Sequence, residues 1–240
     1  MNFLYIEGRR SVEEAIKSNA NINYIMVADG LHLGSIISLA KEHNIRIKTV
    51  SKTKMDYTSK TKKHQGVIAV VSGFEYADTD EILKISENKN EKPFLIILDQ
   101  ISDPHNLGAI IRSAECFASH GVLIPKNRSA AVNETVYRSS AGAVSHIPIA
   151  QVTNISTEID RLKKLGLWIV CADMDGEDID AFDFDMPLAL VFGAEGSGVS
   201  RLVKEKCDFI VKIPIKGEVA SLNVSVAAGI IMHKISRVRN

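Results

Sequence analysis

Cysteine is scarce in this sequence, and long apolar runs are lacking. The cysteines at 116, 171 and 207 are odd in number, with no CxxC pair and no histidine at ligand spacing. This argues against a disulfide framework and a metal site, and it suits a reducing cytoplasm. No stretch approaches 18 apolar residues, and the N-terminus lacks a basic start followed by an apolar run. We therefore expect no membrane span, no signal peptide and a cytoplasmic location.

A net charge is also lacking, because 29 Lys and Arg balance 29 Asp and Glu. The basic residues are nevertheless concentrated in one stretch, where only Asp56 opposes them. They are Arg46, Lys48, Lys52, Lys54, Lys60, Lys62 and Lys63. Such a stretch favours sequence-independent contacts with nucleic-acid phosphates. A solvated lysine-rich face explains the charge pattern at least as well when it is considered alone.

The first ~75 residues alternate between helical and strand patterns, which predicts a small α/β unit. The first helix is expected over Ser11–Ser18, where Ser11 and Glu14 form a capping-box pattern. The expected elements that follow are a strand over Asn23–Ala28, a helix over Leu33–Glu42, and strands over Ile45–Val50 and Val67–Ser72.

Residues 76–92 are polar and are interpreted as a linker with one helical turn around Ile82–Ile85. The second unit, residues 93–240, opens with the apolar strand Phe94–Asp99. Strands and helices then alternate to the end of the sequence. This predicts an α/β domain with a mostly parallel sheet that is covered on both faces.

Three strand–loop–helix segments of the second unit carry candidate chemistry. The first, Asp103–Glu115, places Asn106 where an N-cap is expected and puts Arg112 and Glu115 one helical turn apart. A surface ion pair with a capping Asn explains this pattern. Alternatively, Glu115 orients Arg112 toward a phosphate or a developing oxyanion.

The second segment, Gly193–Gly198, has three glycines and a lone acid, Glu195. It matches neither a phosphate-binding P-loop nor a dinucleotide fingerprint, and a tight turn explains it without a ligand. The third segment supplies Ser221, Asn223 and Ser225 before a helix. Helix capping accounts for one of these residues but not for three at alternate positions. Ligands of open α/β sheets bind at such strand ends.

Together, DPHNLGAIIRSAE, VFGAEGSGVS and IPIKGEVASLNVSVA closely resemble the three motifs of the SpoU (TrmH-like) RNA 2′-O-ribose methyltransferases of the SPOUT superfamily. The resemblance covers about Phe94–Arg239. The N-terminal unit resembles the L30e-like substrate-binding domain of the bacterial 23S rRNA guanosine-2′-O-methyltransferase subgroup, through EGRRSVEEA and HQGVIA. Arg10 stands where that subgroup usually has Asn, and Ala118 where the family tends to have Gly.

The resemblance implies a C-terminal domain with a deep trefoil knot and a homodimer that forms the site, with the last helix, Val224–Arg237, contributing. It implies S-adenosylmethionine as cofactor and RNA as partner. The implied cofactor-binding residues are Gly193, Gly198, Ile213, Ser221 and Leu222. The implied catalytic residues are Asn106, Arg112, Glu195, Asn223 and Ser225. The implied RNA-binding residues are Arg9, Arg10, Lys52, Lys54, Lys60, Lys62, Lys63 and His64.

The implied reaction is methyl transfer to a ribose 2′-hydroxyl, with a guanosine of 23S rRNA as the expected target. Arg112 is the family's proposed base, but a guanidinium stays protonated, so Arg112 could instead stabilise the alkoxide. Alternatives are a tRNA or another rRNA site, or a noncatalytic RNA-binding protein without cofactor affinity. A Rossmann-type methyltransferase needs a Gly-rich loop after the first strand, and ILDQISDPHN does not supply one.

Overall fold

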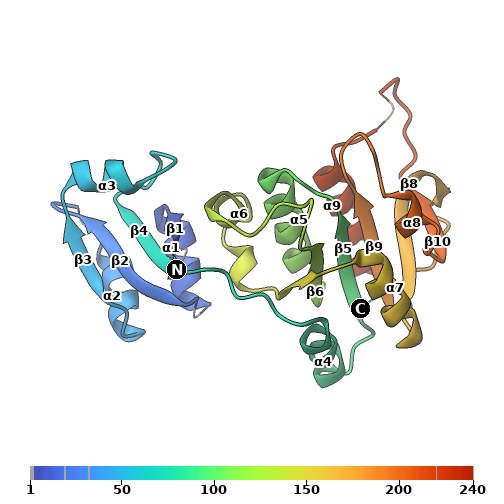
Figure 1. The fold of residues 1–240 in the computed structure, drawn as a ribbon, viewed down its shortest axis with the longest axis horizontal. Coiled ribbons are helices and arrows are strands. Elements are labelled where there is room, and N and C mark those ends of the chain that lie inside the picture. The colour runs from blue at the N-terminus through green and yellow to red at the C-terminus, as the bar shows by residue number, and fades with distance from the viewer. Residues whose placement is uncertain (1–2, 19, 32, 220, 240) are drawn as a thin grey trace. The chain divides into compact units, whose positions relative to one another are not determined.

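The computed structural model describes residues 3–18, 20–31, 33–219 and 221–239 (Figure 1). The chain forms two compact units. The N-terminal unit comprises Met1–Glu75 together with Val132–His146, and the second unit comprises Tyr76–Ala131 and Ile147–Asn240. No helix in the described part is long and apolar enough to cross a membrane.

The N-terminal unit is built on a four-stranded sheet with the order β1-β4-β2-β3. β4 pairs antiparallel with both of its neighbours, and β2 pairs parallel with β3. The strands are β1 (Phe3–Glu7), β2 (Ile22–Ala28), β3 (Ile47–Val50) and β4 (Val67–Ser72). The helices are α1 (Arg9–Lys17), α2 (Gly34–Glu42), α3 (Lys52–Thr58), α6 (Glu134–Ser139) and the 3₁₀ turn η1 (Ala143–Ser145).

The segment Val132–His146 was expected to belong to the second domain, but it groups with the N-terminal unit. Glu134 accepts hydrogen bonds from the Lys60 ammonium at 3.1 Å and from the backbone N–H of Tyr5 at 3.4 Å. At the other end of the segment, the His146 ring lies 2.9 Å from the carboxylate of Glu14. Because both ends of this segment contact the N-terminal unit, the segment packs with that unit although its sequence lies within the second domain.

The start of the first helix differs from the capping-box prediction. α1 begins at Arg9, its N-cap is Gly8, and Ser11 is buried inside the helix. Gly8 has a φ of 94°, a conformation that residues with a side chain rarely adopt. The N-cap therefore lies three residues earlier than the Ser–Glu pattern indicates.

A capping box does form in the stretch that was predicted to be a linker. α4 (Thr79–Lys89) is capped by Asp78 and Glu81, and it is longer than the single turn expected. Ile82 and Leu83 are buried in the core of the second unit. Its buried apolar residues are few among many polar ones, which is why composition alone suggested a linker.

The second unit contains a six-stranded sheet with the order β10-β8-β9-β5-β6-β7, in which every pairing is parallel, as predicted. The strands are β5 (Phe94–Asp99), β6 (Gly121–Pro125), β7 (Ile149–Val152), β8 (Trp168–Asp178), β9 (Leu188–Gly193) and β10 (Phe209–Lys212). β5 and β9 are buried along their whole length, so their residues are almost uniformly apolar.

Helices cover this sheet. α4, α7 (Ile155–Lys164) and α8 (Arg201–Lys204) contribute to one apolar core with alternate residues of β5, β8 and β9. α5 (Pro104–Cys116) and α9 (Val224–Val238) pack against each other and against β6 and β9. Successive strand residues point to opposite faces, so Ile97 faces the first core and Ile96 the other side. This arrangement brings the carboxyl ends of β5, β8, β9 and β10 to one edge of the sheet.

Candidate active site

A cavity of about 230 Å³ lies beside the middle of β8 and at the carboxyl ends of β9 and β10 in the second unit. All five residues for which a cofactor contact was expected line it. These are Gly193, Gly198, Ile213, Ser221 and Leu222. The sequence separates them by up to 29 positions, and the parallel strands bring them together. The cavity therefore lies where open α/β sheets place their ligands.

The Gly-rich turn after β9 forms one wall of the cavity. A Cβ atom on Gly193 would lie 2.0 Å from the carbonyl carbon of Gly198, closer than real side chains ever come. The amide of Gly198 donates to the carbonyl of Ala194 at 2.9 Å and closes the turn. Glycine at 193 is therefore required for the turn to fold back on itself.

Asp99 holds the far end of this turn, a role that the motif comparison did not assign. Its side chain is 4% exposed, and its carboxylate accepts a 2.8 Å hydrogen bond from the backbone N–H of Ser200, the N-cap of α8. Asp99 also lies opposite Gly193 in the β5–β9 register. The sequence does contain a signal for this role, since Asp99 is a lone acid at the end of a fully apolar strand. A buried acid needs a partner, so a contact of Asp99 with a neighbouring segment could have been expected.

Four of the five expected catalytic residues form a continuous chain of hydrogen bonds. The amide nitrogen of Asn106 donates to the Glu195 carboxylate at 3.3 Å. The amide oxygen of Asn106 accepts from the amide nitrogen of Asn223 at 3.1 Å. The amide oxygen of Asn223 in turn accepts from the backbone N–H and the hydroxyl of Ser225, at 2.9 and 2.6 Å. This Glu195–Asn106–Asn223 network adjoins the cavity, because Glu195 also lines it.

The helix ends explain why the two asparagines differ in role. Asn106 was expected to be the N-cap of α5, but it is not. Asp103 caps the helix by accepting from the backbone N–H of His105, and Pro104 begins it. Asn106 lies within the first turn and is 9% exposed, so its amide is free to join two motifs. Asn223 is a helix cap, for α9, yet its amide nitrogen still reaches Asn106.

Arg112 is the expected catalytic residue that the structure does not bring to this network. It lies six residues after Asn106 on α5, about 120° around the helix axis, and its side chain is exposed. In the described part of the chain, Arg112 forms no ion pair with Glu115, so the expected pairing is absent. The arginine therefore lies on a different face of α5 from Asn106 and is open to solvent.

Asp173 and Met174 line the cavity from the middle of β8, and the motif comparison missed both. The Asp173 carboxylate pairs with the ammonium of Lys204 at 2.9 Å. Hydrogen bonding to Asp173 raises the pKa of Lys204, so this ammonium stays charged. β8 continues to Asp178, so the strand-end rule does not identify these two residues from the sequence.

The cysteines do not provide a nucleophile. Cys171, beside the cavity residue Ala172, is fully buried, and its contact with Cys207 and its burial raise the pKa of its thiol. Burial also raises the pKa of Cys116. Thiolates are the reactive form of cysteine, so these thiols are unsuited to covalent catalysis.

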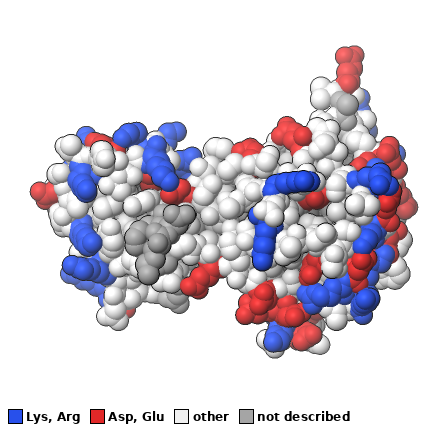
Figure 2. All heavy atoms as spheres, viewed as in Figure 1, with Lys and Arg blue, Asp and Glu red and all other residues white. Residues whose placement is uncertain are grey.

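Seven of the eight residues expected to contact RNA have exposed side chains on the N-terminal unit, over which Lys and Arg gather in Figure 2. They are Arg9, Arg10, Lys52, Lys54, Lys60, Lys62 and Lys63. Lys60 is paired with Glu134, and the guanidinium of Arg9 donates to the backbone carbonyl of Gln65 at 3.3 Å. Within the described residues, Lys52, Lys54, Lys63 and Arg10 form no ion pair and are open to phosphates.

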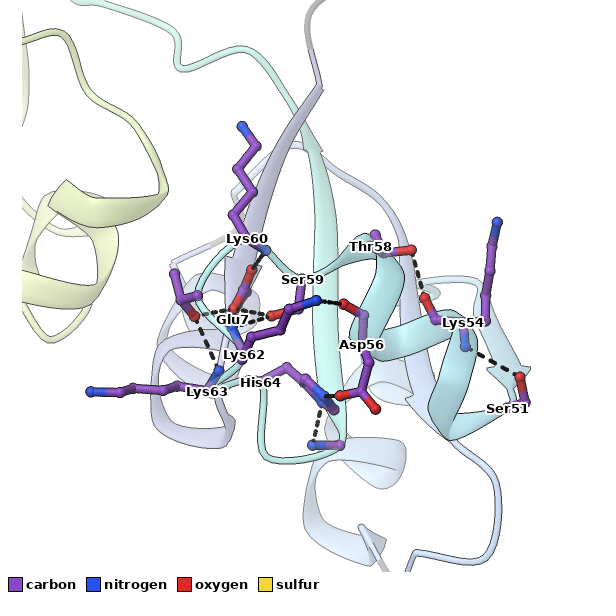
Figure 3. A network of polar contacts seen from close by, with 12 residues as sticks. Glu7, Ser51, Lys54, Asp56, Thr58, Ser59, Lys60, Lys62, Lys63 and His64 are labelled. Carbon is purple, nitrogen blue, oxygen red and sulfur yellow. Dashed lines mark hydrogen bonds and ion pairs between the residues drawn. The ribbon is translucent and has the colours of Figure 1, made fainter.

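Glu7 fixes the loop that carries several of these lysines (Figure 3). Its carboxylate is 6% exposed and accepts from the Ser59 hydroxyl and the Lys60 backbone N–H, both at 2.8 Å, and from the Thr61 hydroxyl. The side chains of Lys60 and Lys63 extend away from this network in Figure 3. A buried acid thus determines the shape of a basic loop.

His64 is the exception among the residues expected to contact RNA. Its side chain is 7% exposed. One ring nitrogen accepts from the backbone N–H of Gly66 at 3.0 Å, which leaves the other to donate to Asp56 at 3.0 Å. This hydrogen bond lowers the pKa of the Asp56 carboxyl. The His64 ring therefore joins α3 to the loop after it and is not open to a phosphate.

Comparison with known proteins agrees with this geometry. Residues 93–233 match the SpoU rRNA Methylase family, and residues 5–77 match the domain described as RNA 2′-O ribose methyltransferase substrate binding. The chain is 45% identical over 240 residues to YacO of Bacillus subtilis, which is described as a TrmH family tRNA/rRNA methyltransferase. The match covers 98% of this chain and 96% of YacO.

Two solved structures share the fold. The SpoU methyltransferase AviRb from Streptomyces viridochromogenes, in complex with the cofactor AdoMet, has a TM-score of 0.83 and 24% identity, and the match covers 99% of this chain and 90% of AviRb. The AdoMet-bound rRNA methyltransferase from Sinorhizobium meliloti has a TM-score of 0.82 and 22% identity, with 98% and 87% covered. The chain thus belongs to the SpoU (TrmH-type) family of RNA methyltransferases and carries that family's substrate-binding domain.

Proposed function

We propose that the protein transfers a methyl group from S-adenosylmethionine to a ribose 2′-hydroxyl of RNA. The observation that carries the proposal is the cavity beside β8 and at the ends of β9 and β10, which adjoins the Glu195–Asn106–Asn223 network. A cofactor pocket and a set of polar groups that can position a hydroxyl thus meet at Glu195. Family membership and the matched substrate-binding domain support the same reaction.

The residues around the cavity fit this cofactor. Apolar side chains suit an adenine ring, and two carboxylates, Asp173 and Glu195, suit a sulfonium cation. Gly193, Ile213 and Leu222 all line the cavity, so their backbone groups can contact the ligand. When bound, S-adenosylmethionine supplies an electrophilic methyl group, so the protein has to position the acceptor and help to remove a proton.

We assign the positioning of the ribose to the hydrogen-bonded network. Glu195 can accept a hydrogen bond from a ribose hydroxyl, and Asn106 holds its carboxylate in place. Asn223 and Ser225 connect this point to the start of α9, so motion of the ribose-binding groups is restrained by two helices. Pre-organised polar groups of this kind lower the barrier because they need no reorganisation during the reaction.

We propose that Arg112 acts on the site of a second copy in a homodimer. Its side chain lies on a different face of α5 from Asn106 and is open to solvent. Leu222, Val226 and Ile230 are 38, 49 and 39% exposed, and Val226 and Ile230 lie on one face of α9. Large exposed apolar side chains in such an array are typical of an interface. The guanidinium would stabilise the developing alkoxide or the adjoining phosphate.

The trefoil knot remains part of this proposal. The motif resemblance implies it, and the two segments that would form it, Gly193–Gly198 and Ile213–Asn223, both contribute residues to the wall of the cavity.

We propose ribosomal RNA as the substrate, with a guanosine of 23S rRNA as the first position to examine. The family description supports rRNA, and the matched N-terminal domain supports an RNA substrate. The test incubates the purified protein and methyl-labelled S-adenosylmethionine with rRNA and tRNA from cells that lack this gene. Label in rRNA supports the proposal. Label confined to tRNA would overturn the substrate, and label in neither RNA would overturn the activity.

A further inference from the structure

Tyr57 is the most exposed large apolar side chain in the described part of the chain, at 84%. It lies on α3, a short helix that is anchored through the fully buried Met55 and capped by Ser51, whose hydroxyl accepts from the Lys54 backbone. Asp56 faces the other way and binds His64 at 3.0 Å. The helix therefore holds an aromatic ring in solvent on a well-anchored support, which burial in the core of this unit does not explain.

The surroundings of the ring are cationic. The Lys54 ammonium lies 5.9 Å from the centre of the Tyr57 ring, within the range of a cation–π contact. Lys52 and Lys60 are exposed on the same helix and on the loop that follows it. Tyr24 provides a contrast, because the Lys48 ammonium lies 3.5 Å from its ring and the ring packs against the core of the unit. Tyr57 lacks such a packed environment.

An exposed aromatic ring among lysines suits one class of ligand. Unpaired RNA bases stack on aromatic side chains while lysines bind the adjoining phosphates. A base inside a duplex is already stacked on both sides and cannot do this. We propose that Tyr57 is a stacking platform for an unpaired base, so that the N-terminal unit selects a single-stranded loop of the RNA. This inference rests on the proposed function, for which it names the form of the substrate.

The test compares ring and charge variants of the full-length protein. The probes are a fluorescent single-stranded RNA of about 12 nucleotides and the same RNA paired with its complement. Binding is measured by anisotropy over a range of KCl concentrations. We expect Tyr57→Leu to weaken single-strand binding about 5- to 150-fold without changing the salt dependence or duplex binding. Tyr57→Phe, the matched control, should bind like the parent protein.

Lys54→Gln provides the charge control and should lower the salt slope by about 0.7, the value for one phosphate contact on a single strand. Since Tyr57 is exposed, the Leu variant should fold normally, which thermal unfolding checks. Equal affinity of Tyr57→Leu for the single strand, or an equal loss on single strand and duplex, would overturn the proposal. So would a loss in Tyr57→Phe as large as that in Tyr57→Leu.

A spectroscopic readout tests stacking directly. The chain has a single tryptophan, Trp168, so Tyr57→Trp in a Trp168→Phe background places the only indole at the proposed platform. The single-stranded RNA should quench its fluorescence, and an abasic strand of equal charge should not. Equal quenching by both would overturn the proposal. Methyl transfer by the parent protein is measured separately, so failure of stacking and failure of the proposed activity are distinguishable.

Discussion

The Asn106→Asp substitution tests the hydrogen-bonded network, because it replaces only the side-chain amide nitrogen with an oxygen. Asn106 donates to Glu195 at 3.3 Å and accepts from Asn223 at 3.1 Å. An ionised Asp keeps the second hydrogen bond, but it places a carboxylate oxygen against the carboxylate of Glu195. A protonated Asp can donate to Glu195 and so restores both contacts. The variant should therefore lose activity when both acids are ionised and regain it on acidification.

The size of the effect follows from the separation of the two acids. Carboxylates that share a site raise one pKa by about 1–3 units, so one acid of the Asn106→Asp pair should titrate at about 5–7. Each pKa unit corresponds to about 1.4 kcal/mol, which predicts methyl transfer about 10- to 1,000-fold slower at pH 8 if the network must be intact. Asn106→Ala removes both hydrogen bonds and adds no charge, so its deficit should not depend on this titration.

The assay is kcat/KM for methyl transfer from labelled S-adenosylmethionine to RNA, measured between about pH 5 and 8.5 for the parent protein and both variants. Dividing by the parent value at each pH removes effects shared by all three proteins. The Asp/parent ratio should rise as the pH falls, while the Ala/parent ratio stays level. An Asp variant as active as the parent at pH 8, or a flat Asp/parent ratio, would refute the positioning role of Asn106.

Three further predictions concern the cavity, the arginine and a buried histidine. Gly193→Ala should weaken S-adenosylmethionine binding at least about 10-fold by calorimetry, because the new Cβ displaces the turn at Gly198. The control is Gly217→Ala, where a Cβ meets nothing within 4 Å. Unchanged binding by Gly193→Ala would contradict the assignment of this turn to the wall of the cofactor cavity. Arg112→Ala should abolish methyl transfer and leave cofactor binding largely intact; normal turnover would exclude a catalytic role. Burial lowers the pKa of His120 below 6.5, and its ring accepts from the Phe94 backbone N–H. The neutral ring therefore stabilises the fold above pH 6.5, and this stability is lost as pH falls through the lowered pKa. Urea unfolding should show a smaller loss on acidification in His120→Gln, and an identical pH dependence would contradict this.

The parallel sheet could be predicted from the sequence because buried strands such as Phe94–Asp99 consist almost entirely of apolar residues. Convergence of the Gly193 and Ser221 segments on one cavity also followed, since parallel strands deliver their ends to one edge. The hydrogen bonds of Asn106 could not be predicted, because short polar side chains fit caps and sites equally well. Composition did not reveal the packing of α4, whose two buried apolar residues lie among polar ones.

The attachment of Val132–His146 to the N-terminal unit lay beyond sequence reasoning for a different reason. It depends on single long-range contacts, such as Glu134 with Lys60 and His146 with Glu14, which leave no periodic pattern. This attachment also affects experimental design. Deleting residues 1–75 would strip these contacts from the segment, so charge substitutions such as Lys54→Gln are the cleaner test of RNA binding.

The chemical position of the transferred methyl group tests the central claim most directly. RNA labelled by the protein and S-adenosylmethionine is hydrolysed in alkali, which cleaves next to every free 2′-hydroxyl. Methylation of a ribose 2′-oxygen blocks this cleavage, so the account predicts that the label is recovered in alkali-stable dinucleotides. Label recovered in mononucleotides would place the methyl group on a base and contradict the account.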